Sequence, residues 1–504
     1  MKIKTLFSFV ITPAISLILI LFFDLEPGNK MVTATLAVAF LMAVWWVTEA
    51  VPLAVTSLLP VALFPLLGIM DGKSVSASYF NDVIFLFMGG FIIALAMQRW
   101  NLHRRIALSI LVMIGTSPGR ILLGFMSATA FLSMWISNTA TAMMMIPILL
   151  SVINKLDETV DENVINRYSI GLLLGVAYSA SIGGMATLVG TPPNLSFVRI
   201  FQIYFPDAPE ISFARWFMFA LPITLVFFGF AWVLLYVMFS PSKHKWSNVD
   251  KNSLRLQLLE IGPMSYEEKV VFINFISVAI LWLFRADLNF GWFTIPGWAQ
   301  IFPFSEYIND GTVAIFIAVL LFVLPSRAEN TRRIMNWKTA ENIPWHIILL
   351  FGGGFALASG FKESGLSTWF GSQLVWVADY HVLLVIFFIS FMMTFLTELT
   401  SNTATTEMIL PILAGIAISS GINPLLLMLP ATLSGSMAFM LPVATPPNAI
   451  IFATNRIKVI EMARAGIYLN LAGAAIITVM TYFLATWVFD INLNEMPLWA
   501  VMTK

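Results

Sequence analysis

The chain has no cysteine and few charged residues. Of its 504 residues, 11% are charged and 59% are hydrophobic, and Lys+Arg equal Asp+Glu at 27 each. A soluble domain has about 25% charged residues, so the composition predicts an all-α polytopic membrane protein. The lack of cysteine excludes disulfides, thiol catalysis and cysteine-ligated metals. The zero net charge gives no support for a nucleic-acid partner.

Residue patterns typical of catalysis are also missing. The four histidines are scattered without metal-ligand spacing: His103, His244, His346 and His381. The chain has no metalloprotease helix motif, no nucleophile elbow and no phosphate loop. We therefore expect neither an enzyme nor an organic cofactor.

Eleven apolar stretches approach the ~20 residues that a helix needs to cross a bilayer. They cover residues 5–24, 31–48, 51–70, 83–98, 168–190, 213–239, 266–284, 311–325, 345–361, 424–453 and 464–489. The first follows Lys2 and Lys4 and lacks a clear cleavage site, so we interpret it as a retained span. The predicted organisation is an N-terminal helix (1–30), a first repeat (31–240), a cytoplasmic connector (241–265), a second repeat (266–490) and an outer tail (491–504).

A duplicated polar motif supports the two repeats. Residues 137–149 and 401–413 are identical at nine of thirteen positions, with an offset of 264, and Gly89-Gly90-Phe91 recurs at Gly353-Gly354-Phe355 with the same offset. Each copy is followed by a Thr-Pro-Pro-Asn segment, at 191–194 and at 445–448, with an offset of 254. Two motifs that recur in the same order indicate an internal duplication.

Each polar motif lies in the middle of an apolar stretch that does not fit a single span. Residues 121–153 would form a helix of ~50 Å, far longer than a ~30 Å bilayer core. A re-entrant hairpin with its tip at Ser137-Asn138-Thr139 fits better than a long tilted helix, because cationic residues stand on both sides. Residues 382–415 have the same design, with the tip at Ser401-Asn402-Thr403. Irregular backbone at such a depth is tolerated where it lines a protein cavity.

The distribution of Lys and Arg orients the chain. With the N-terminus in the cytoplasm and the C-terminus outside, 20 of the 27 Lys+Arg residues fall inside, as the positive-inside rule requires. Five spans separate the hairpins, so the first enters from the cytoplasm and the second from outside. This predicts inverted repeats, which in many secondary transporters hold substrate and ions near the midplane.

The tips offer groups that suit both an anion and a hard cation. A helix start attracts anions through its free N–H groups, and hydroxyl and carbonyl oxygens suit a hard cation. We predict that two pairs each share a helix face, i and i+4: Ser133 with Ser137, and Thr397 with Ser401. The Thr-Pro-Pro segments would form the other wall. A single hydroxyl in an apolar helix usually bonds its own backbone, but that explains a matched pair of constellations poorly.

These paired motifs resemble the divalent anion:sodium symporter family, from about residue 31 to 490. The resemblance implies a sodium symporter for dicarboxylates in the inner membrane, built as a homodimer in which a transport domain moves like an elevator against a scaffold domain. It implies substrate contacts at Asn138, Thr139, Ser401, Asn402 and Thr403, with Thr191, Pro192, Thr445 and Pro446 in the other wall. It also implies two or more sodium ions, held by Ser133, Ser137, Asn138 and Gly190 at one site and by Thr397, Thr400, Asn402 and Ala444 at the other.

Two acidic residues in the second hairpin need separate interpretations. Glu398 matches the family pattern, and an anchoring role is favoured over ion coupling, because a bare carboxylate would repel a dianion. Glu407 aligns with Met143 of the first copy and has no assigned role. The sequence leaves open a sodium-independent dicarboxylate exchanger, citrate or sulfate as the cargo, and an anion channel.

Overall fold

The computed structural model describes residues 7–157, 161–241, 251–289, 293–328, 332–493 and 495–501. Helices dominate. Those of the first half are the π-helix η1 (Phe7–Ile11), α2 (Thr12–Phe22), α3 (Lys30–Thr48), α4 (Leu53–Thr56), α5 (Leu59–Leu66), α6 (Gly72–Ala77), α7 (Asp82–Arg99), α8 (Leu102–Ile114), α9 (Pro118–Ser133), α10 (Asn138–Asp157), α11 (Glu162–Gly184), α12 (Pro192–Tyr204) and α13 (Phe213–Phe239).

The second half continues with the same architecture and one small β-hairpin. Its elements are α14 (Lys251–Glu260), α15 (Tyr266–Leu283), β1 (Leu288–Asn289), β2 (Thr294–Ile295), the 3-10 helices η3 (Trp298–Ile301) and η4 (Ser305–Tyr307), α16 (Asp310–Val323), α17 (Trp337–Ala340), α18 (Trp345–Ser364), α19 (Leu366–Gln373), the 3-10 helix η5 (Val375–Asp379), α20 (Val382–Leu396), α21 (Asn402–Ser420), α22 (Pro424–Ser434), α23 (Pro446–Phe452), α24 (Val459–Val488) and α25 (Leu498–Val501).

The apolar helices make this a multi-pass membrane protein. Within the described ranges, seven helices are long and apolar enough to cross a bilayer, and five further apolar helices are shorter. Some expected single spans are wrong. The stretch 51–70 forms two short helices, α4 and α5, because Pro60 stands at the start of α5, where its missing N–H costs nothing. The total of eleven spans stays a prediction.

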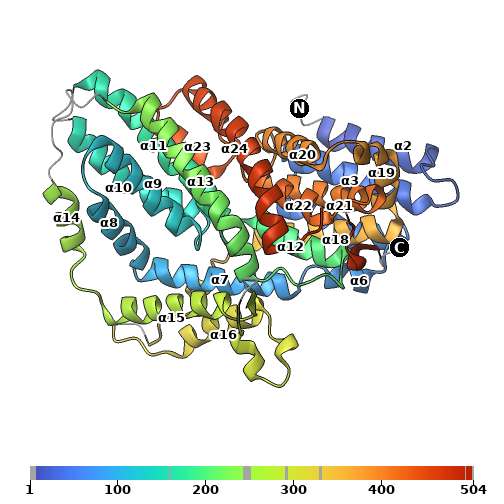
Figure 1. Ribbon diagram of the computed structural model, residues 1–504, viewed down its shortest axis with the longest axis horizontal. Coiled ribbons are helices and arrows are strands. Elements are labelled where there is room, and N and C mark those ends of the chain that lie inside the picture. The colour runs from blue at the N-terminus through green and yellow to red at the C-terminus, as the bar shows by residue number, and fades with distance from the viewer. Residues whose placement is uncertain are drawn as a thin grey trace.

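The helices gather in two groups that exchange one helix each (Figure 1). In one group α9, α10, α11 and α13 lie side by side, and in the other α18, α19, α21 and α22 pack together. The short helix α12 follows α11 in the chain but packs against α21 and α22. Conversely, α23 follows α22 but packs against α10 and α11. The two halves of the sequence are therefore interlocked.

The repeated glycines mark two close helix crossings. A Cβ on Gly89 of α7 would lie 2.6 Å from the backbone of Ala314 on α16. A Cβ on Gly353 of α18 would lie 2.5 Å from the backbone oxygen of Ser57, next to α4. Real Cβ atoms essentially never approach so closely, so glycine is required at both members of the repeated pair.

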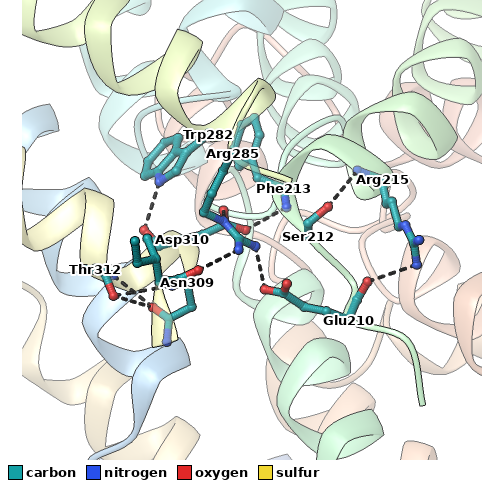
Figure 2. Close-up of polar contacts among 10 residues, drawn as sticks. Glu210, Ser212, Phe213, Arg215, Trp282, Arg285, Asn309, Asp310 and Thr312 are labelled. Carbon is teal, nitrogen blue, oxygen red and sulfur yellow. Dashed lines mark hydrogen bonds and ion pairs between the residues drawn. The ribbon is translucent and has the colours of Figure 1, made fainter. Parts of the chain in front are cut away.

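An ion-pair cluster joins the start of α13 to α15 and α16 (Figure 2). The Arg285 guanidinium contacts Glu210 at 2.5 Å and Asp310 at 2.6 Å, and Asp310 also accepts a 2.7 Å bond from the Phe213 N–H. Burial raises the pKa of Glu210, and the charge of Arg285 offsets part of that rise. The cluster fixes the connection between α12 and α13.

Candidate substrate and cation site

The first hairpin tip brings three oxygen atoms together. The helix α9 ends at Ser133, and the next helix, α10, begins at Asn138. The Ser133 hydroxyl lies 2.6 Å from Asn138 Oδ1 and 2.7 Å from the carbonyl oxygen of Ala180 on α11. One hydroxyl hydrogen can satisfy only one of these acceptors. The surplus of oxygen lone pairs suits a hard cation.

The second tip repeats this arrangement. The Thr397 hydroxyl lies 2.7 Å from Asn402 Oδ1 and 3.0 Å from the carbonyl oxygen of Gly435, just after α22. Asn138 and Asn402 are both the first residue of a helix. Each tip therefore combines an oxygen cluster with a helix start, where free N–H groups favour an anion.

The carbonyl oxygen of Gly190, a predicted sodium ligand, lies beside the first oxygen cluster. A Cβ built on Gly184 would lie 2.6 Å from Asn138 Oδ1 and 3.1 Å from the Gly190 carbonyl oxygen. Both oxygens thus border the space that the missing side chain leaves. In the described part of the chain, no hydrogen bond joins Ala444 to Thr397 or Asn402, and the place of Ala444 in the second site stays a prediction.

The predicted sharing of a helix face by the hydroxyl pairs is wrong. α9 ends at Ser133 and α20 ends at Leu396, so Ser137 and Ser401 lie beyond the last turn. Ser137 instead accepts a bond from the Ala140 N–H at 3.3 Å. The helices end before the tip, and this lets Ser133 turn toward Asn138.

Thr400 uses its hydroxyl locally. It donates to the Leu396 carbonyl at 2.8 Å and also contacts the Thr405 hydroxyl. If Thr400 binds an ion, its carbonyl oxygen is the group left to do so.

The two chain breaks are held by matching asparagines. Asn194 donates to the carbonyls of Gly184 (3.2 Å) and Thr187 (2.7 Å), and Asn448 donates to those of Ala438 and Leu441, both at 3.1 Å. Each pair of acceptors recurs at the 254-residue offset of the motif. The tandem prolines begin α12 and α23.

The remaining predicted substrate residues surround these helix starts. Thr191, Thr403 and Thr445 are buried, and Pro192 and Pro446 begin α12 and α23. Thr139 follows Asn138 on the first turn of α10. Because α10 packs against α23 and α12 packs against α21, the helix that follows each break packs against the helix that follows the tip of the other repeat.

Glu398 has the contacts of an anchor. Its carboxylate accepts bonds from the N–H groups of Phe439 (2.6 Å), Met440 (2.8 Å) and Leu441 (3.1 Å), and from the Asn470 amide (2.7 Å). Four donors compensate the buried charge. The residue ties the second tip to the second break and to α24.

Sequence reasoning missed two of the backbone oxygens in the clusters. The Ala180 and Gly435 carbonyls complete the oxygen clusters, but a carbonyl group leaves no trace in residue type. Gly184 carried a weak signal, because glycine marks places where a side chain would intrude. Among the described residues, no group of three or more His, Asp or Glu side chains could hold a metal ion.

Comparison with known proteins shows the family to which this chain belongs. Residues 4–491 match the family described as "Sodium:sulfate symporter transmembrane region". The sodium-dependent dicarboxylate transporter SdcS of Staphylococcus saprophyticus is 42% identical over 498 residues, covering 97% of this chain and 93% of that relative. The chain belongs to the divalent anion:sodium symporter family. The transporter of the same name from Staphylococcus aureus is also 42% identical, over 497 residues.

Solved structures of other transporters share the fold of this family member. The YdaH transporter of Alcanivorax borkumensis matches with a TM-score of 0.54 at 12% identity, covering 83% of this chain and 87% of its own. MtrF of Neisseria gonorrhoeae matches with a TM-score of 0.54 at 13% identity, covering 95% and 98%. The symporter family consists of transporters, so the prediction that the protein is not an enzyme is confirmed.

Proposed function

We propose that this protein is a sodium-coupled symporter that takes up C4-dicarboxylates such as succinate, fumarate and malate across the inner membrane. The observation that carries the proposal is the repeated cluster of hydroxyl, asparagine and carbonyl oxygens, each beside a helix start. The names of the staphylococcal relatives support sodium and dicarboxylate as the transported species.

The charges explain why the two species are coupled. A helix start carries roughly half a positive charge, so two of them neutralise a dianion only in part. Neither tip contains Lys or Arg. Sodium ions in the two oxygen clusters supply the missing positive charge. By linkage, sodium raises the affinity for dicarboxylate, and dicarboxylate raises the affinity for sodium by the same factor.

The transport cycle that fits this site is an elevator motion. In our proposal the hairpins and the helices after them, α9–α13 and α20–α24, move as one unit in each subunit of a homodimer. The remaining spans form the scaffold, with the two repeats inverted in the membrane. This assignment follows the family resemblance and the interlocking of α12 and α23 with the opposite repeat.

One experiment tests the proposal directly. Labelled succinate uptake is measured in proteoliposomes with external sodium, external potassium or internal dicarboxylate as the only variable. We expect saturable uptake that requires sodium. Equal uptake in potassium that depends on internal dicarboxylate would identify an exchanger, and unlabelled citrate or sulfate as competitors would reveal a different cargo.

A further inference from the structure

Glu407, the second acidic residue of the second hairpin, lies apart from the candidate substrate and cation site. Glu407 is on α21 and has no solvent exposure. Its Oε1 accepts a 2.9 Å bond from the Ser196 hydroxyl on α12, whereas no described residue forms a hydrogen bond with Oε2. The aligned residue of the first repeat, Met143, is 60% exposed. The carboxyl group is therefore not part of the duplicated machinery.

The carboxyl group fills a space that a glycine provides. A Cβ on Gly354 of α18 would lie 2.2 Å from the carboxyl carbon of Glu407. Two residues earlier on α18, Gly352 faces the ring of Tyr79. The Tyr79 phenol is close enough to interact with the Glu407 carboxyl group. The Tyr79 hydroxyl donates to the Ser57 carbonyl at 2.5 Å. Glu407 is thus enclosed between α12, α18 and α21.

No cation on the surrounding helices neutralises this carboxyl group. On α12, Arg199 pairs with Asp82, and Tyr204 donates to the Ala358 carbonyl. On α18, Lys362 donates to the Ile203 carbonyl. His346 and Glu363 are exposed near the ends of α18. α21 carries no other ionisable residue.

Glu407 differs from Glu398 in the donors available to stabilise a negative charge. Glu398 has four donors and can remain a carboxylate, whereas Glu407 has one neutral hydroxyl. A buried ion without a charged partner costs several kcal/mol, and such groups become neutral instead. Sodium would need several oxygen ligands, but among the described residues only Ser196 Oγ forms a hydrogen bond with this group. We propose that Glu407 is a proton-binding site, protonated in this conformation, and that its proton regulates transport.

This inference rests on the proposed function for its effect on transport. Two sodium ions and a dianion cancel in charge, so an ionised Glu407 would add to the moving unit a buried negative charge that, unlike the carboxylate of Glu398, has only one donor to stabilise it. A proton on Glu407 removes that charge. Transport should then be fastest where Glu407 is protonated and should decline at alkaline pH.

The proton itself can be detected without any transport measurement. Infrared spectroscopy of the purified protein should show the C=O stretch of a protonated carboxylic acid that Glu407→Gln removes. The matched control is Glu398→Gln, which should remove no such band because four donors stabilise the Glu398 carboxylate. A spectrum that Glu407→Gln leaves unchanged in this region would overturn the proposal, whatever the protein transports.

The effect on transport is measured with fumarate in proteoliposomes, from mildly acidic to mildly alkaline pH. Fumarate remains a dianion over this range, so the profile reports the protein. We expect wild-type uptake to fall on the alkaline side and Glu407→Gln to transport at all these pH values. Identical profiles, or loss of uptake in a folded Glu407→Gln protein, would refute the regulatory role.

A second variant covers the case in which Glu407→Gln fails to fold. Ser196→Ala removes the donor that stabilises the ionised form, so the pH at which uptake is half-maximal should rise by about 1 to 2 units. An unchanged midpoint would contradict the proposal. If sodium-driven uptake is absent in the wild type but the infrared band is lost in Glu407→Gln, the proton site stands and the proposed function fails.

Discussion

Gly184 offers a direct test of the first cation site. In Gly184→Ala the new Cβ would lie 2.6 Å from Asn138 Oδ1, where 3.4 Å is the start of ordinary contact. The amide oxygen must therefore retreat by about 0.8 Å. Substitution of a group that orients a metal ligand typically costs about 10- to 100-fold in metal affinity. We expect the sodium concentration for half-maximal uptake to rise by a factor in that range.

The assay is initial succinate uptake in proteoliposomes across a series of sodium concentrations. Gly229→Ala is the matched control, because Gly229 lies within α13 and a Cβ there meets nothing within 4 Å. It should leave the sodium dependence unchanged. If Gly184→Ala folds, reconstitutes and keeps the wild-type sodium dependence, Asn138 and Gly190 do not share an ion at this point, and the assignment of the first site is wrong.

Three further predictions concern the tips, the orientation and the ion-pair cluster. Asn138→Ala and Asn402→Ala should each reduce uptake at least tenfold, since each loses an ion ligand and a helix-start contact worth about 1 kcal/mol or more; unchanged uptake in both would contradict this. Because the protein lacks cysteine, Lys155→Cys should react with an impermeant reagent only from the cytoplasm and Ser419→Cys only from outside, and labelling of both from one side would exclude inverted repeats. Arg285→Ala should destabilise the protein by about 3 kcal/mol, because it leaves the buried Asp310 carboxylate without its charged partner, and an unchanged thermal stability in detergent would show that the cluster is dispensable.

The sequence predicted the positions of the tips well. Polar residues inside apolar stretches are expensive in a membrane, and a constellation that occurs twice is hard to explain by chance. The breaks in the structure fall at 134–137 and 397–401, where the motifs begin. The sequence also indicated the family, which the comparisons confirm. All of these depend on residue type and spacing, which are local properties of the chain.

The partners of each hydroxyl were decided by the tertiary structure. Spacing placed Ser133 with Ser137, but α9 ends at Ser133, and the hydroxyl contacts Asn138 and the Ala180 carbonyl instead. Where a helix stops depends on the segments that pack around its end. The exchange of α12 and α23 between the two helix groups is likewise a result of packing.

What the sequence by itself determined is a membrane transporter with two copies of one polar motif, because composition and repetition can be read residue by residue. Only the tertiary structure showed that the carbonyls of Ala180 and Gly435 complete the two oxygen clusters and that Glu407 is enclosed beside Gly354. Carbonyl groups are the same in every residue, and the environment of a carboxyl group is set by helices distant in the chain. Neither property can be read from a linear pattern.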